Sequence, residues 1–198
     1  MSLHQLSPTP DLTRHPAVVA PELLGCVLVG RGAAGIITEV EAYHHDDAAC
    51  HGFGRTPTDR TRTLFGPAGR AYVYFTYGMH WCTNIVTAAD GEASAVLIRA
   101  LRPISGIELM RSRRSSRRST PCPDRHLTHG PACVTQALGI TGDDDGLHLL
   151  DANAQVRLMG RDPLLLQQHD IDPDMVVATP RIGISRAVER PWRFVVPR

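Results

Sequence analysis

Two oppositely charged residues stand in segments whose other residues are typical of buried strands. Glu41 lies in the alternating stretch 36–43, and Arg99 is the charged residue of the apolar stretch 95–101. An arginine does not lose its proton in a protein, so its burial requires a carboxylate or several other acceptors. Glu41 or Glu39 is the natural partner. Such a pair can be a purely structural ion pair, or it can hold a carboxylate ready for acid–base chemistry.

Aromatic side chains are the second group that could do chemistry. Strand alternation places Tyr43 on the same face as Glu41, and it places Tyr72 and Tyr74 together on another strand. Tyrosines on one face can line a pocket for a flat ligand, and stacking on a nucleobase contributes about 1–3 kcal/mol per base. Tyr77 and Met79 occupy a predicted turn, where polar residues are usual. An exposed aromatic tip could insert as a wedge between base pairs.

The segment 44–51 is rich in side chains that can bind metals. A metal-dependent hydrolase built on His44, His45, Asp47 and His51 is therefore one hypothesis. Their spacing matches neither the H-E-x-x-H motif nor the deaminase zinc motif. A polar loop after a strand is the interpretation that the pattern favours.

The charge distribution is more informative than the net charge of +1. Residues 99–125 carry eight arginines against two acidic residues (+6), residues 143–174 carry eight aspartates against two arginines (−6), and the stretch from 175 onward carries +4. The basic segment could bind phosphates, and a non-catalytic nucleic-acid module is a second alternative. All 21 basic residues are arginine, so no side-chain amine is available to form a Schiff base.

Short strands in hairpins must position these residues. We expect strands at 26–29, 36–43, 71–75, 81–86, 95–101 and 193–196, and helices at 16–24, after Pro103 and at 131–139. The glycines of 30–35 fit the G-x-G-x-x-G pattern, but a strand-like stretch follows them, so they predict a turn rather than a dinucleotide site. Phe75 is expected in the core. These elements predict one α+β domain over 1–198, with a mainly antiparallel sheet and peripheral helices.

Composition limits the class of protein further. With 42% hydrophobic and 21% charged residues, the chain is neither disordered nor membrane-spanning, and its N-terminus does not match a secretory signal. The five cysteines are odd in number and form no C-x-x-C pair, which is typical of a reduced intracellular protein. We therefore expect a cytoplasmic protein, associated with the nucleoid if its source is bacterial.

Many separated motifs, in sequence order over nearly the whole chain, resemble those of the alkyladenine (3-methyladenine) DNA glycosylase family. The motifs lie at 39–43 (EVEAY), 47–51 (DAACH), 54–57 (GRTP), 65–79 (FGPAGRAYVYFTYGM), 82–84, 96–103 (VLIRALRP), 130–131, 136–139, 180–183 (PRIG) and 192–194. The resemblance implies a curved antiparallel sheet and a reaction without a metal or organic cofactor. It implies as partner a double-stranded DNA that contains a damaged purine, bound by a monomer without membrane contact.

The resemblance also implies roles for individual residues. Glu41 would be the general base that activates the attacking water, which Arg99 and the main-chain carbonyl of Ile182 would help to hold. The flipped base would lie between Tyr43, His51 and Tyr74, with Tyr72 bonded to His51 and Asn84 screening against guanine. Tyr77 and Met79 would form the wedge in the minor groove. Further contacts to DNA are expected from arginines, namely Arg55, Arg111, Arg113, Arg114, Arg117 and Arg118.

The absence of lysine adds an expectation of its own. A glycosylase that also nicks the strand needs an amine to form an imine with the sugar. Without a lysine side chain, the enzyme is expected to stop at the abasic site, as a monofunctional glycosylase of base excision repair.

Overall fold

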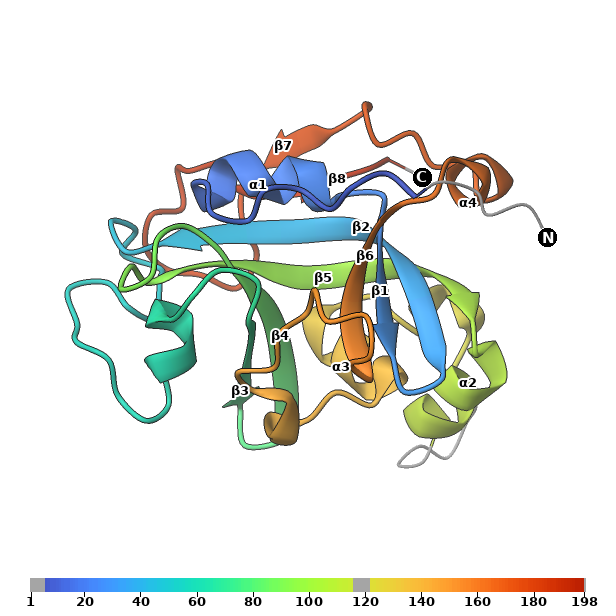
Figure 1. The fold of residues 1–198 in the computed structure, drawn as a ribbon, viewed down its shortest axis with the longest axis horizontal. Helices are drawn as coiled ribbons and strands as arrows, with labels where there is room; N and C mark the ends of the chain where they lie inside the picture. Colours follow the sequence, from blue (N-terminus) through green and yellow to red (C-terminus); the bar gives the residue numbers. More distant parts are fainter. Residues whose placement is uncertain (1–5, 116–121, 198) are drawn as a thin grey trace.

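The computed structural model describes residues 6–115 and 122–197, which are built around one open sheet (Figure 1). Its eight strands are β1 (Cys26–Gly30), β2 (Ala33–His44), β3 (Ala71–Thr76), β4 (His80–Val86), β5 (Ser94–Ser105), β6 (Val156–Arg161), β7 (Val177–Thr179) and β8 (Arg193–Val195). The main path runs β3-β4-β5-β2-β1-β6, and β8 joins β2 to β7. Every pairing is antiparallel, which confirms the predicted α+β class.

The two longest strands, β2 and β5, form the spine of this sheet. One edge of β2 pairs with β5, and its other edge pairs first with β1 and then, at residues 39–41, with β8. The register between β2 and β5 shifts on both sides of Glu39. Irregularities of this kind re-aim side chains and are common near active sites. The middle of β2 is therefore covered on both edges, and this is where the predicted carboxylates lie.

Four helices cover the sheet in the described part of the chain: α1 (Pro16–Leu23), α2 (Ile107–Ser115), α3 (Pro131–Leu138) and α4 (Pro163–Gln168). Helix α1 packs on β2 and β5, and α3 packs on β4, β5 and α2; Figure 1 shows α1 above the sheet and α2 and α3 below it. Helix α3 ends at Gly139, whose φ of 69° is left-handed, as the sequence predicts for its stop. None of the described helices is long and apolar enough to cross a membrane.

Most predicted elements are confirmed, with some corrections. The glycine-rich stretch does form a hairpin turn, since Arg31 and Gly32 take left-handed φ values of 41° and 83° between β1 and β2. Strand β6, helix α4 and strand β7 were not predicted. The expectation for Phe75 was wrong, because its side chain is 42% exposed and packs on Trp81 at the outer end of β3.

Candidate active site

Glu41 lies at the centre of the sheet with its side chain 0% exposed. Its Oε2 atom accepts hydrogen bonds from the Tyr43 hydroxyl (2.8 Å) and from Arg99 Nη1 (3.1 Å). Its Oε1 atom accepts one from the main-chain N–H of Ile182 (2.7 Å). Burying a carboxylate is costly unless donors replace its water, and these three donors do so. Glu41 is thus a fixed, buried oxygen acceptor.

Arg99 connects Glu41 to Glu39, which lies two residues earlier on the same face of β2. Its Nε atom donates to Glu39 Oε1 at 2.9 Å, and Arg193 from β8 donates to the same oxygen at 2.7 Å. From the sequence, either Glu39 or Glu41 could be the partner of Arg99, and in the structure Arg99 bonds to both. Burial raises the pKa of Glu39, but the hydrogen bonds from Arg193 and Arg99 outweigh it and hold that pKa below the usual range. Charges therefore alternate along a row that ends at Glu41.

A second buried ion pair, between Arg181 and Asp47, holds the loop that reaches Glu41. Both side chains are 0% exposed, and Arg181 Nη2 lies 3.0 Å from Asp47 Oδ1. The guanidinium also donates to the carbonyl of Ala42 (2.9 Å) and lies 4.7 Å from the centre of the Tyr43 ring. The pair thereby fixes Ile182, the next residue, against Glu41. Arg181 was not predicted to have a role, although it belongs to the motif at 180–183.

Aromatic rings from β3 and from the loop after β2 form a further part of the site. His51 Nδ1 and the Tyr72 hydroxyl are 3.0 Å apart, and the rings of His51 and Tyr74 meet edge to face at 4.6 Å. Burial lowers the pKa of His51, with help from Arg60 and Arg55, so its ring stays neutral. The predicted contact between Tyr72 and His51 is present.

These groups enclose a cavity of about 600 Å³, a size common for small-molecule sites. All eight residues predicted to be catalytic or substrate-binding line it, namely Glu41, Tyr43, His51, Tyr72, Tyr74, Asn84, Arg99 and Ile182. Asn84 donates from its side chain to the main-chain carbonyl of Tyr72 (2.9 Å), which orients its amide. The cavity is therefore large enough to admit a flat ligand of the size of a nucleobase beside a carboxylate.

The β3–β4 turn projects beside the mouth of this cavity. Tyr77 and Gly78 have left-handed φ values of 51° and 66°, and the turn is closed by a hydrogen bond from Met79 N–H to the carbonyl of Thr76 (3.2 Å). Tyr77 is 83% exposed and lines the cavity, and Met79 is 60% exposed. A tyrosine rarely adopts such a backbone, and strain of this kind is typical of functional sites.

Of the arginines predicted to bind phosphates, the described ones in α2 make contacts within the protein. Arg114 is buried, 7% exposed, and pairs with Gln136, so its prediction as a DNA contact was wrong. Arg113 donates to the carbonyls of Ala137 (2.9 Å) and Arg31 (2.8 Å) and so fastens α2 to its neighbours.

The remaining predicted DNA contacts have different surroundings. Arg111 is exposed but forms ion pairs with Asp124 and Glu108. Arg117 and Arg118 lie outside the described residues. Arg55 is exposed at the cavity, as a DNA contact would require.

The metal set considered for 44–51 is not brought together. Asp47 is held by Arg181, and His51 is held by Tyr72 at the cavity. No group of metal-ligating side chains within the described residues includes Asp47 or His51.

A buried carboxylate facing a cavity walled by aromatic rings is the kind of site that base-flipping hydrolases use, because an extruded base is held by stacking. Comparison with known proteins agrees. The family model described as methylpurine-DNA glycosylase (MPG) matches residues 11–198. The chain belongs to this family of DNA-repair hydrolases.

Three relatives illustrate how much of the chain the likeness covers, and each is named "Putative 3-methyladenine DNA glycosylase". The protein from Rhodopseudomonas palustris is 49% identical over 176 residues, which cover 89% of this chain and 77% of the relative. The one from Methanoculleus marisnigri is 45% identical over 184 residues (91% and 90%). The one from Burkholderia cenocepacia is 45% identical over 194 residues (96% and 87%).

Proposed function

We propose that the protein is a monofunctional DNA glycosylase that extrudes damaged purines from duplex DNA and hydrolyses their N-glycosidic bond. The observation that carries this proposal is the position of Glu41, buried and fixed by three donors at the wall of a cavity lined by aromatic rings and large enough for a nucleobase. The product would be an abasic site, an intermediate of base excision repair.

The hydrogen bonds of Glu41 indicate where the attacking water would bind. A carboxylate oxygen has about two lone-pair positions. Oε2 already accepts from Tyr43 and Arg99, whereas Oε1 accepts only from the N–H of Ile182 within the part of the chain that the structure describes. The free position on Oε1 would hold the water, close to the main chain of Ile182, whose carbonyl is expected to help orient it.

The reaction then needs one proton transfer at Glu41. The water oxygen would bond to the sugar C1′ while its proton passes to Glu41 Oε1, and the base would leave with the electron pair of the broken C1′–N bond. The negative carboxylate would also stabilise the oxocarbenium-like sugar. Arg99 would hold Glu41 in place through its hydrogen bond to Oε2.

The base itself would stack between Tyr43 and the rings of His51 and Tyr74. Burial raises the pKa of Tyr43 and of Tyr74, so both hydroxyls stay protonated, and His51 stays neutral. None of these three groups is a strong acid toward the base. Alkylated purines already carry a positive charge and need no acid to leave, so we expect them to be released faster than neutral hypoxanthine or ethenoadenine.

Glu41→Gln tests the proposal under single-turnover conditions. On duplexes with one 7-methylguanine, followed by alkali to cleave abasic sites, base release should fall about 10²–10⁴-fold, the usual contribution of a general base. Lesion binding should persist. The exposed Glu189 offers the control, because Glu189→Gln removes a carboxylate without touching the cavity. A Glu41→Gln variant that releases base at the wild-type rate would overturn the assigned role.

The monofunctional character has a separate test. The chain has no lysine side chain, so borohydride should trap no covalent complex with an abasic duplex. Efficient trapping would show that another amine acts as a lyase.

A further inference from the structure

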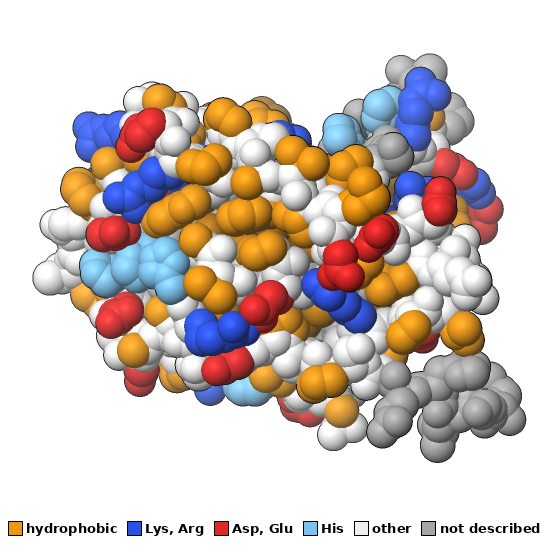
Figure 2. Space-filling model, turned by 90° about the horizontal axis from the view of Figure 1, so that it is seen from above, with side chains coloured by type: hydrophobic (Ala, Val, Ile, Leu, Met, Phe, Trp, Pro, Cys, Tyr) orange, Lys and Arg blue, Asp and Glu red, His pale blue; other side chains and the backbone are white. Residues whose placement is uncertain are grey.

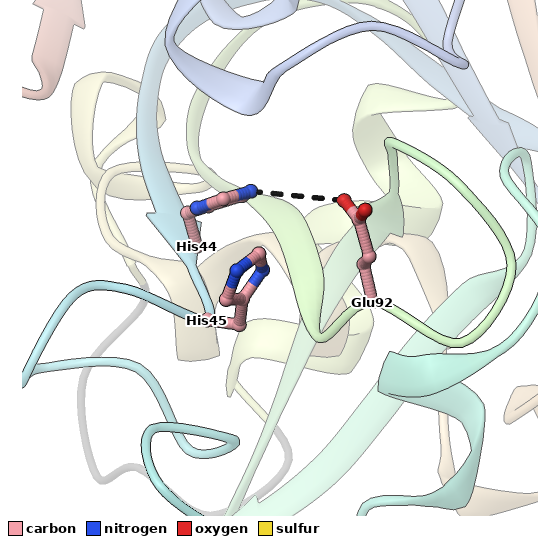
Figure 3. A group of neighbouring side chains, drawn as sticks. All are labelled: His44, His45 and Glu92. Carbon is pink, nitrogen blue, oxygen red and sulfur yellow. Dashed lines mark ion pairs between the residues drawn. The ribbon is translucent and has the colours of Figure 1, made fainter.

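Three metal-ligating side chains meet at the end of β2, outside the cavity that holds Glu41. His44 and His45 come from the end of this strand, and Glu92 comes from the β4–β5 connection (Figure 3). One ligand atom from each lies within 4.8 Å of the others, and His44 Nε2 lies 3.9 Å from Glu92 Oε2. Figure 2 shows histidine side chains gathered side by side on this surface, with acidic side chains next to them.

His44 is oriented as a metal ligand needs to be. Its Nδ1 atom lies 2.9 Å from Asp46 Oδ1, and Arg190 holds the same oxygen at 3.0 Å. The ring of His15 packs against it at 4.4 Å. A carboxylate on Nδ1 fixes the tautomer with its proton there and leaves the lone pair of Nε2 free for a metal. That free nitrogen is the one that faces Glu92.

We propose that His44, His45 and Glu92 form a binding site for a divalent transition-metal ion of the Zn²⁺ type. Two imidazoles and one carboxylate suit such ions, whereas Mg²⁺ and Ca²⁺ prefer sites made only of oxygen. Ligand atoms of a tetrahedral Zn²⁺ ion, with bonds of about 2.0–2.2 Å, lie about 3.3 Å apart. The separation of 3.9 Å between His44 and Glu92 would have to shorten by about half an ångström, and the other separations, all within 4.8 Å, by up to about 1.5 Å. His45 and Glu92 are both exposed.

The groove beside His45 and Glu92 leaves room for a further ligand of the ion and for the ion to exchange with solvent. A groove of about 540 Å³ is lined by His45, Glu92 and Arg55. Water or an anion from this groove could complete the coordination. The ion would tie the end of β2 to the β4–β5 connection, and it would stabilise the fold in proportion to its occupancy. The site shares no ligand with the hydrolytic centre and does not depend on the proposed function.

Metal binding to the intact protein is the direct test. Dialysed protein at pH 7.5, where imidazoles are mostly neutral, should bind one Zn²⁺ per chain in equilibrium dialysis. One equivalent should raise the thermal midpoint, and Co²⁺ in its place should give visible absorption bands of a coordinated ion. Mg²⁺ should do neither.

Substitutions of the proposed ligands distinguish Zn²⁺ binding at this site from Zn²⁺ binding by other surface histidines. His45→Ala and Glu92→Gln should each lose the stoichiometric Zn²⁺ and the rise in midpoint, and Asp46→Asn should weaken binding about 10–100-fold as a partner of a ligand. His126→Ala is the matched control, because His126 is an exposed histidine near His129 and should leave binding unchanged. Binding that survives both His45→Ala and Glu92→Gln, or no stoichiometric binding by the wild type, would overturn the proposal.

Discussion

The buried pair between Asp47 and Arg181 should be essential for stability, and Asp47→Asn tests this. The substitution keeps the shape of the side chain but leaves the Arg181 charge without a carboxylate in a site where both side chains are 0% exposed. Removing one partner of a buried ion pair typically costs about 3–5 kcal/mol. Arg181 keeps the carbonyls of Ala42 (2.9 Å) and Ala187 (3.2 Å) as acceptors, so the lower end of that range applies, about 3 kcal/mol.

This cost can be converted into a thermal shift. In a chain of this size, each kcal/mol lowers the midpoint by roughly 2–4 °C, so about 3 kcal/mol predicts a loss of about 6–12 °C. Thermal and urea unfolding followed by circular dichroism would measure it. Glu22→Gln is the control, because Glu22 pairs with Arg14 at the surface, with side chains 41% and 40% exposed, and such pairs contribute little.

Base release supplies the second readout. Arg181 precedes Ile182, whose N–H holds Glu41 at 2.7 Å, so a displaced Arg181 should also displace that donor. At a temperature where Asp47→Asn is still folded, its single-turnover rate should be lower than that of the wild type. A variant that unfolds within about 1 kcal/mol of the wild type would refute the argument from burial, since breaking such a pair should cost several kcal/mol.

Tyr43→Phe removes the 2.8 Å hydrogen bond to Glu41, and since such bonds to charged groups contribute about 1.5–3 kcal/mol, base release should fall about 10–100-fold in single turnover. Tyr77→Ala removes an 83% exposed side chain, so the affinity for a lesion-containing duplex in a fluorescence titration should fall, while the free energy of unfolding should stay within about 0.5 kcal/mol of the wild-type value. Burial raises the pKa of Cys26 and of Cys50 to about 11, so iodoacetamide at pH 8 should label neither until urea is added, and mass spectrometry would show it. Because these pKa values lie above the usual thiol value of 9.0, the corresponding stability is present below pH 9 and is lost as pH rises toward 11.

Sequence patterns predicted the part of the site that lies on strands. Alternation put Glu41 and Tyr43 on one face, and an arginine within an apolar strand required a buried acceptor, so Arg99 could be paired in advance. Arg181 escaped prediction because its segment has no periodic pattern that indicates burial. A loop residue becomes buried only through tertiary contacts, here with Asp47 and Trp192.

Strand β6 and helix α4, both in the acidic segment 143–174, were missed for a different reason. Its net charge of −6 suggested a surface patch, yet β6 has a clear alternation of buried and partly buried residues. Helix α4 carries the usual start signals, Asp162 as N-cap and Pro163 in its first turn. Asp144 closes a capping box and pairs with Arg31 at 2.8 Å. Aspartates here cap elements and neutralise arginines, so counting charge along the sequence overstated the patch.

The choice of arginine at the two buried positions follows from the geometry of the site. Arg99 reaches Glu39 through Nε and Glu41 through Nη1, and Arg181 contacts Asp47 and two carbonyls through its two Nη atoms. A lysine ammonium is one compact charge whose pKa falls readily on burial, so it could lose its proton and leave the carboxylate unpaired. A guanidinium stays charged and presents several donors in fixed directions. A carboxylate that has to stay buried and in place, as the proposed hydrolysis requires of Glu41, therefore favours arginine beside it, independently of any contact with DNA.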